Sequence, residues 1–146
     1  MEWNTLNLLK GSFKMNEGHE NFGALSKKEK AVSFLQLVAS GKVREAYKSH
    51  IGHGFSHHNP YFRGDAESLM LAMEKDARTN PEKKLEVKHA IEEGDLVVVH
   101  SHVKQNPEDL GVALVHIFRF QDGRIIELWD LAQPVPEDLT NENGIF

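Results

Sequence analysis

The chain of 146 residues contains no cysteine, which excludes disulfide bonds and thiolate chemistry. It also has no run of the roughly 18 apolar residues that a membrane-spanning helix needs. Basic residues form no cluster, and the net charge of -5 makes the surface a poor partner for a phosphate backbone. We therefore expect no nucleic-acid partner, no membrane partner and a reducing, cytoplasmic setting.

A length of 146 residues is sufficient for one domain with a hydrophobic core. Hydrophobic residues make up 40% of the chain and charged residues 27%, as in an ordinary globular protein. Residues 1–25 show no sustained apolar period, so we expect an N-terminal arm that packs poorly, with Met15 as an alternative start. The domain itself is expected over residues 26–146.

Helices are predicted in the first half of the domain. Ser26 and Glu29 have the spacing of a capping box, apolar residues follow at helical spacing, and Gly41 is a natural stop. A second, shorter helix is expected at residues 43–49, and a third between Asp65 and Asn80. Residues 50–64 are rich in Gly, His and Asn and are expected to be irregular, with at most a short strand.

After Pro81 the apolar period changes from 3.6 to 2, which indicates strands. Four strand segments are expected, at residues 85–92, 96–102, 112–120 and 125–132. Because helices come first and antiparallel strands last, the predicted class is α+β, with the helices packed on a curved sheet.

The last hairpin carries His116 on one strand and Asp130 on the other, within an apolar pattern. Burying an imidazole and a carboxylate is costly unless they pair, hydrogen-bond or act on a ligand. A two-residue loop at the turn would put them on opposite faces, whereas a three-residue loop would pair His116 with Leu128. We favour the second register, which pairs apolar residues and leaves Asp130 diagonal to His116 on one face, with Ile126 also on that face. Trp129 would lie on the other face.

The preceding hairpin places His89, His100 and His102 together on one face among Leu and Val. A turn at Glu93-Gly94 would set His89 against Val98. How this face aligns with the last hairpin is left open by the sequence.

Several segments together resemble a known family. They are FSHHNP at Phe55–Pro60, EEGDLVVVHSH at Glu92–His102, IFRFQDGRIIELWDLAQPVP at Ile117–Pro136 and the closing NENGIF. With the order of elements, they are similar to the SnoaL-like polyketide cyclases of the nuclear-transport-factor-2-like superfamily. The resemblance implies a cystatin-like, cone-shaped half-barrel with helices packed on a curved, mixed sheet around a deep, mostly apolar pocket.

The resemblance also implies an activity. In such cyclases an aspartate and a histidine perform aldol condensation by proton transfer without a cofactor, and these roles fall on Asp130 and His116. Asp130 would take a proton next to a carbonyl, and His116 would stabilise the enolate oxygen. His58, Asn59, His100 and His102 would orient polar groups of the substrate. The expected ligand is a small hydrophobic carbonyl compound, and the reaction a cyclisation, isomerisation or hydration.

Each of these residues has a simpler interpretation. Asp130 could be a structural carboxylate held by backbone amides or by Asn59, and His116 could merely bond a neighbour. His58 and Asn59 could shape a turn, while His57 is expected to be a solvated loop residue. The alternative for the whole chain is a non-catalytic module that binds a small ligand or a protein partner.

Two further expectations concern metals and assembly. His100 and His102 imitate the first motif of metal-binding cupins, but the carboxylate expected three or four residues later is missing. We therefore expect no required metal and no cofactor. Val115, Ile117 and Trp129 on the outer face predict a homodimer.

Overall fold

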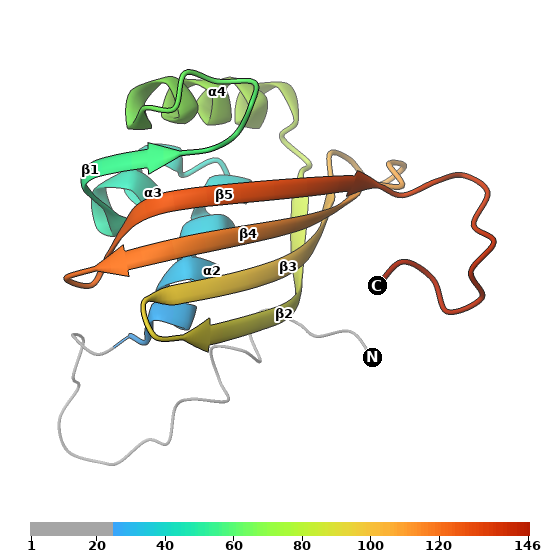
Figure 1. Cartoon of the computed structure of the whole chain (residues 1–146). Coiled ribbons are helices and arrows are strands. Elements are labelled where there is room, and N and C mark those ends of the chain that lie inside the picture. Colours follow the sequence, from blue (N-terminus) through green and yellow to red (C-terminus); the bar gives the residue numbers. More distant parts are fainter. Residues whose placement is uncertain (1–24) are drawn as a thin grey trace, which may run out of the picture.

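The computed structural model describes residues 25–146, so the expected arm, apart from Leu25, lies outside the described residues. Three helices precede four consecutive antiparallel strands, with one more strand between the helices (Figure 1). The elements are α2 (Lys27–Ala39), α3 (Val43–His50), β1 (Ile51–His57), α4 (Ala66–Thr79), β2 (Lys84–Glu93), β3 (Leu96–Lys104), β4 (Val112–Gln121) and β5 (Arg124–Pro134).

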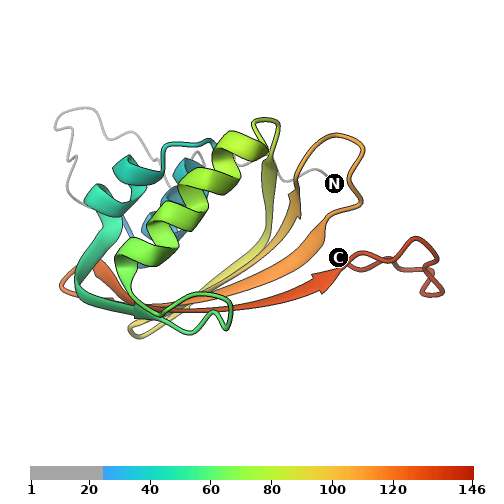
Figure 2. The same cartoon turned by 90° about the horizontal axis from the view of Figure 1, so that it is seen from above.

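The strands form one sheet in the order β1-β5-β4-β3-β2. β1 runs parallel to β5, and the other neighbours are antiparallel. The sheet curves beneath the three helices, which all lie on its concave face (Figure 2). The predicted α+β class with helices on a curved, mixed sheet is therefore confirmed.

The core lies between α2 and the middle of the sheet. Phe34 is fully buried and meets the ring of Phe118 edge-on, with the ring centroids 6.0 Å apart. The capping box forms as expected, since Glu29 N–H donates to Ser26 Oγ at 3.1 Å and Ser26 N–H to a Glu29 carboxylate oxygen at 3.2 Å. Within residues 25–146, none of the helices combines the length and the apolar character needed to cross a bilayer.

The register of the last hairpin differs from both registers considered above. Asp122 and Gly123 have φ of 50° and 75° and form a two-residue turn, because Gln121 pairs with Arg124. A bulge at Ile126 then shifts the pairing by one residue. This bulge puts Ile125, rather than Ile126, into the core.

The shift brings His116 directly opposite Asp130. The expectation that both lie on one face is confirmed, whereas the expected diagonal placement and the pairing of His116 with Leu128 are wrong. The bulge could not be read from the sequence because Ile125 and Ile126 are equally apolar.

The earlier hairpin is corrected in the same way. Glu93 pairs with Leu96, so the turn is Gly94-Asp95, and His89 stands opposite His100 instead of Val98. β3 pairs with β4 so that Val99 lies beside His116 and His100 beside Val115. The even-numbered histidines of β3 therefore face away from the helices.

Candidate active site

Asp130 is fixed by a residue far away in the sequence. It is half-buried on β5, and the side-chain amide of Asn59 donates to its Oδ1 at 3.1 Å and its Oδ2 at 2.9 Å. Asn59 Oδ1 in turn accepts the backbone N–H of Tyr61 at 3.0 Å. The amide therefore binds the carboxylate and orients it, while its oxygen holds the loop in shape. The structure thus brings Asn59, which was expected to bind substrate, directly to the carboxylate of Asp130.

His116 lies on β4, directly across from Asp130, and is 8% exposed. Its Nδ1 is buried and has no hydrogen-bond partner within the described residues. Burial lowers the pKa of His116 to about 4; nearby Asp130 opposes this lowering, and the charge of Lys83 adds to it. The imidazole is therefore neutral at physiological pH and can donate or accept one hydrogen bond to a ligand.

A second buried histidine was missed at the level of sequence. His57, expected to be a solvated loop residue, is the last residue of β1 and only 5% exposed. It pairs with Leu128, two residues before Asp130 on the neighbouring strand. Desolvation lowers the pKa of His57, partly offset by the charges of Asp130 and Asp65. The FSHHNP segment indicates that a histidine lies near the site. Only the formation of a strand by residues 51–57 reveals which of its two histidines points inward.

His58 points the other way. Its ring stacks on Trp129 with centroids 4.9 Å apart, and its Nε2 lies 2.8 Å from Glu127 Oε1. Glu127 and Trp129 are on the face of β5 opposite to that of Asp130, as their alternation requires. The structure thus places His58 outside the group formed by Asp130 and His116, contrary to the expected role in substrate binding.

His100 and His102 also lie on the outer face, so the structure does not bring them to Asp130. The ring of His100 stacks on His89, whose Nδ1 lies 3.0 Å from that of His100. His102 Nε2 is 2.8 Å from the Leu110 carbonyl oxygen, and the ring of Phe146 covers His102 at 4.4 Å. The ring nitrogens of His100 and His102 therefore contact different groups. Over residues 25–146 no three His, Asp or Glu side chains are grouped as metal ligands.

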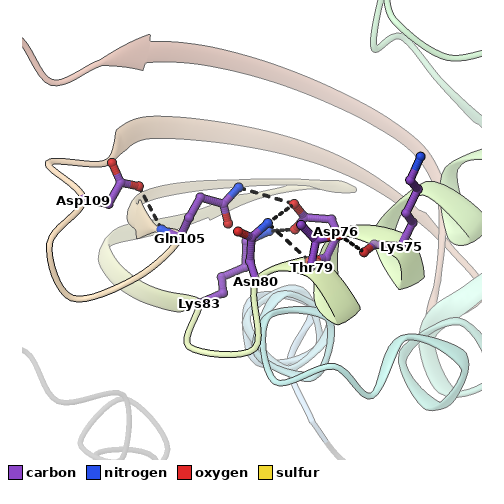
Figure 3. A network of polar contacts seen from close by, with 7 residues as sticks. All are labelled: Lys75, Asp76, Thr79, Asn80, Lys83, Gln105 and Asp109. Carbon is purple, nitrogen blue, oxygen red and sulfur yellow. Dashed lines mark hydrogen bonds and ion pairs between the residues drawn. The ribbon is translucent and has the colours of Figure 1, made fainter.

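A second polar cluster gathers around Asp76 near the end of α4. The carboxylate of Asp76 at the end of α4 accepts hydrogen bonds from Asn80 Nδ2 at 2.9 Å and Gln105 Nε2 at 3.3 Å, and it pairs with Lys83 (Figure 3). This cluster ties α4 to the segment after β3. It also supplies the positive charge of Lys83 that helps to keep His116 neutral.

Two hollows lie elsewhere on the surface. One of about 310 Å³ is bordered by Gln36, Leu85 and His102, and one of about 500 Å³ by Arg44, Glu74 and Arg78. Neither is lined by Asp130 or His116, so the deep apolar pocket implied by the resemblance does not coincide with either of them.

Comparison with solved structures supports the fold. An NTF2-like protein of unknown function from Cytophaga hutchinsonii ATCC 33406 is 20% identical, with a TM-score of 0.62 over 76% of this chain and 93% of that one. A putative polyketide cyclase from Bacillus cereus ATCC 10987 is 23% identical, with a TM-score of 0.61 over 74% and 78%. An uncharacterised cystatin-fold protein from Novosphingobium aromaticivorans is 19% identical, with a TM-score of 0.61 over 74% and 99%.

The sequence itself matches one family model. No curated protein sequence matches the chain. The model for the SnoaL-like domain matches residues 31–128, about two thirds of the chain, and includes His57, Asn59 and His116. Asp130 lies two residues beyond the matched range and is held against it by Asn59. The chain therefore belongs to the SnoaL-like domain family.

Proposed function

We propose that this chain is a cofactor-independent enzyme that enolises a small hydrophobic carbonyl compound and leads it to aldol cyclisation or isomerisation. The observation that carries this proposal is the placement of a fixed carboxylate, Asp130, directly across the sheet from a buried neutral imidazole, His116. Similarity to a putative polyketide cyclase supports the reaction class.

The geometry supports a division of roles. Directly opposed side chains in an antiparallel pair have Cβ atoms about 4.5–5.5 Å apart. Asp130 is half-buried and bound by Asn59, so its orientation is set before a ligand arrives. A carbonyl compound lying over the ends of the two side chains would place its α-carbon at the carboxylate and its oxygen at the imidazole.

The proposed steps conserve protons and electrons. Asp130 takes the α-proton, the electron pair of the C–H bond forms a C=C bond, and the π pair of the C=O bond moves to the oxygen, which becomes an enolate oxygen. Neutral His116 donates a hydrogen bond to that oxygen and stabilises it without giving up its proton. In an aldol reaction the enolate carbon attacks a second carbonyl carbon, and the new alkoxide recovers the proton from Asp130. In an isomerisation the proton returns to a different carbon.

Exchange of the α-proton in deuterated water tests the proposal directly, because it requires only the abstraction of that proton and the return of a deuteron to the same carbon. We expect the protein to catalyse exchange in members of a panel of enolisable polyketide-like and small keto compounds. Asp130→Asn keeps the shape and one of the two hydrogen bonds from Asn59 but removes the base, so exchange should fall about 10²–10⁴-fold. Asp95→Asn is the control because it alters another hydrogen-bonded carboxylate, which accepts from Arg119 at 2.8 Å and contacts neither His116 nor Asp130. Equal exchange by wild type and Asp130→Asn would contradict the assignment of the base.

One observation favours a second candidate function. The Asn59 amide already binds both oxygens of Asp130, as a purely structural carboxylate would require. In a non-catalytic module that binds small ligands, these hydrogen bonds would serve only to hold the loop after β1 against β5. In that case Asp130→Asn would leave ligand affinity unchanged, and the wild-type protein would exchange no α-proton of any bound compound.

A further inference from the structure

The hydrogen bonds of His57 determine which of its nitrogens carries the proton. The backbone N–H of Asn59 donates to His57 Nδ1 at 3.2 Å, so Nδ1 is the unprotonated nitrogen. A neutral imidazole has one protonated nitrogen, and here it must be Nε2. Burial lowers the pKa of His57, which favours the neutral ring.

The protonated nitrogen of His57 has no partner within the described residues. Nε2 is buried, and the residue is only 5% exposed. A buried donor left without an acceptor destabilises the folded state, so native structures rarely keep one without a use. The rings nearest to His57 belong to Phe55 and Phe62, which offer no strong acceptor.

His57 lies on the strand next to that of Asp130, opposite Leu128 and two residues short of Asp130. β5 lies between β1 and β4, so His57 and His116 flank Asp130 from its two neighbouring strands. Asn59 connects these groups, because its backbone binds His57 while its side chain binds Asp130. Each histidine has one buried nitrogen without a partner.

We propose that His57 is a second hydrogen-bond donor of the site and presents Nε2–H to an acceptor oxygen of the ligand. This inference rests on the proposed function in taking that oxygen to be the carbonyl or enolate oxygen of the compound on which Asp130 acts. Two neutral donors would then share the developing negative charge. Neither donor would give up its proton, so the anion would remain reactive.

A phenolate is a suitable probe because its oxygen anion sits on a planar carbon, as in an enolate. The host protein is the Asp130→Asn variant, whose neutral amide imitates the base after it has taken the proton. Binding of 4-nitrophenolate is followed by its absorbance at mildly alkaline pH. We expect saturable binding. No binding at millimolar 4-nitrophenolate would overturn the proposal, because unpaired donors beside a neutral side chain should attract the anion.

Two substitutions in the Asp130→Asn host separate the functions of the ring. His57→Gln places an amide N–H near the position of Nε2 but removes the acceptor for the Asn59 N–H. His57→Asn keeps an acceptor near the position of Nδ1 but has no donor at Nε2. We expect His57→Asn to weaken 4-nitrophenolate binding about ten- to hundredfold, the loss typical of a hydrogen bond to a charged acceptor, and His57→Gln to retain most of it. The opposite order would overturn the proposal and make His57 a support for Asn59 only.

His50 provides the matched control. It is also buried, at 7% exposure, but its Nε2 lies 3.0 Å from Ser33 Oγ, on the helices. His50→Gln should therefore leave 4-nitrophenolate affinity unchanged. In protein with 15N-labelled histidine, adding the probe should shift the Nε2–H proton of His57 downfield and leave the ring nitrogen signals of His50 unmoved. An unmoved His57 signal at saturation would overturn the proposal.

The two proposals can fail separately. If no α-proton exchange occurs but 4-nitrophenolate binding depends on His57 as expected, the site binds oxygen anions and the enzymatic function is refuted. If exchange occurs and His57→Asn leaves both exchange and 4-nitrophenolate binding unchanged, the enzymatic function remains and the role of His57 is refuted.

Discussion

The side-chain amide of Asn59 bridges both carboxylate oxygens of Asp130, at 3.1 and 2.9 Å, across 71 residues of sequence. This contact joins the loop after β1 to the middle of β5. It sets the carboxylate in one orientation beside His116, and it depends on His57, whose ring holds the Asn59 backbone. The loop after β1 thus carries the Asn59 amide, which orients the proposed base.

Asn59→Ala should lower the α-proton exchange rate about 10- to 100-fold while changing KM less, because it frees the carboxylate to rotate without removing it. The measurement is exchange in deuterated water at saturating substrate. Asn80→Ala is the control, since Asn80 also donates to a carboxylate, that of Asp76 at 2.9 Å (Figure 3). Equal losses in both variants would mean that the effect of Asn59 is one of general stability.

Much of the fold could be predicted because its signals are local. The capping box at Ser26, the cap at Asp65 and the alternation of the strands each depend on neighbouring residues. That His116 and Asp130 share a face was predicted by matching apolar residues across the pair, although the two-residue turn alone would have put them on opposite faces. The register itself was not predicted, because the bulge at Ile126 lies within an apolar run and does not change the hydrophobic pattern of the sequence.

The outer positions of His58, His100 and His102 show the limit of motif reading. A residue in a matching motif is close to the site along the chain. Neighbouring residues of a strand point to opposite faces of the sheet, however, so the motif does not tell which of them reaches the site. In FSHHNP the inward residue is His57, and His58 stacks on Trp129 instead. Only the pairing of β3 with β4 reveals that His100 shares a face with Val115 rather than His116.

Ser101→Ala should raise the free energy of unfolding by about 1 kcal/mol. The Ser101 side chain is fully buried on the inner face of β3, and its Oγ has no hydrogen-bond partner among the described residues. Removing an unsatisfied hydroxyl removes its desolvation cost. Ser33→Ala should have the opposite sign, because the Ser33 hydroxyl lies 3.0 Å from His50 Nε2. Urea denaturation of the three proteins measures both changes, and a loss of stability in Ser101→Ala would show that a water or ligand satisfies the hydroxyl.

We propose that the protein forms a homodimer through the outer face of its sheet. The most exposed apolar side chains there are Ile91 and Leu131, 62% and 61% exposed, while Val115, Ile117 and Trp129 are half-buried. Sedimentation equilibrium at micromolar concentration should give twice the 16.5 kDa chain mass. Leu131→Glu should shift the equilibrium to monomer. Leu71→Glu, at an exposed leucine of α4 on the other side, should not, and a wild-type protein that sediments only as a monomer would contradict the proposal.

The stability of the protein should fall on acidification between about pH 6.5 and pH 4, in part because of His116. The unfolded chain binds a proton at His116 as the pH drops below 6.5, whereas the folded chain, with its pKa lowered to about 4, does not. Protons therefore favour unfolding across this window, by roughly 3 kcal/mol in total for this residue.

His116→Gln cannot take up that proton, so its free energy of unfolding should depend less on pH over the same window. The contributions of His50, His57 and His100 remain in the variant, because their pKa values are also lowered by burial. Urea denaturation at several pH values between 7.5 and 4 gives the difference between wild type and variant, which should be constant above about pH 6.5 and should change in favour of the variant below it. Parallel curves down to pH 4 would mean that His116 is protonated equally in the folded and unfolded chains. Burial in the folded chain would then not be the cause that keeps the His116 ring neutral.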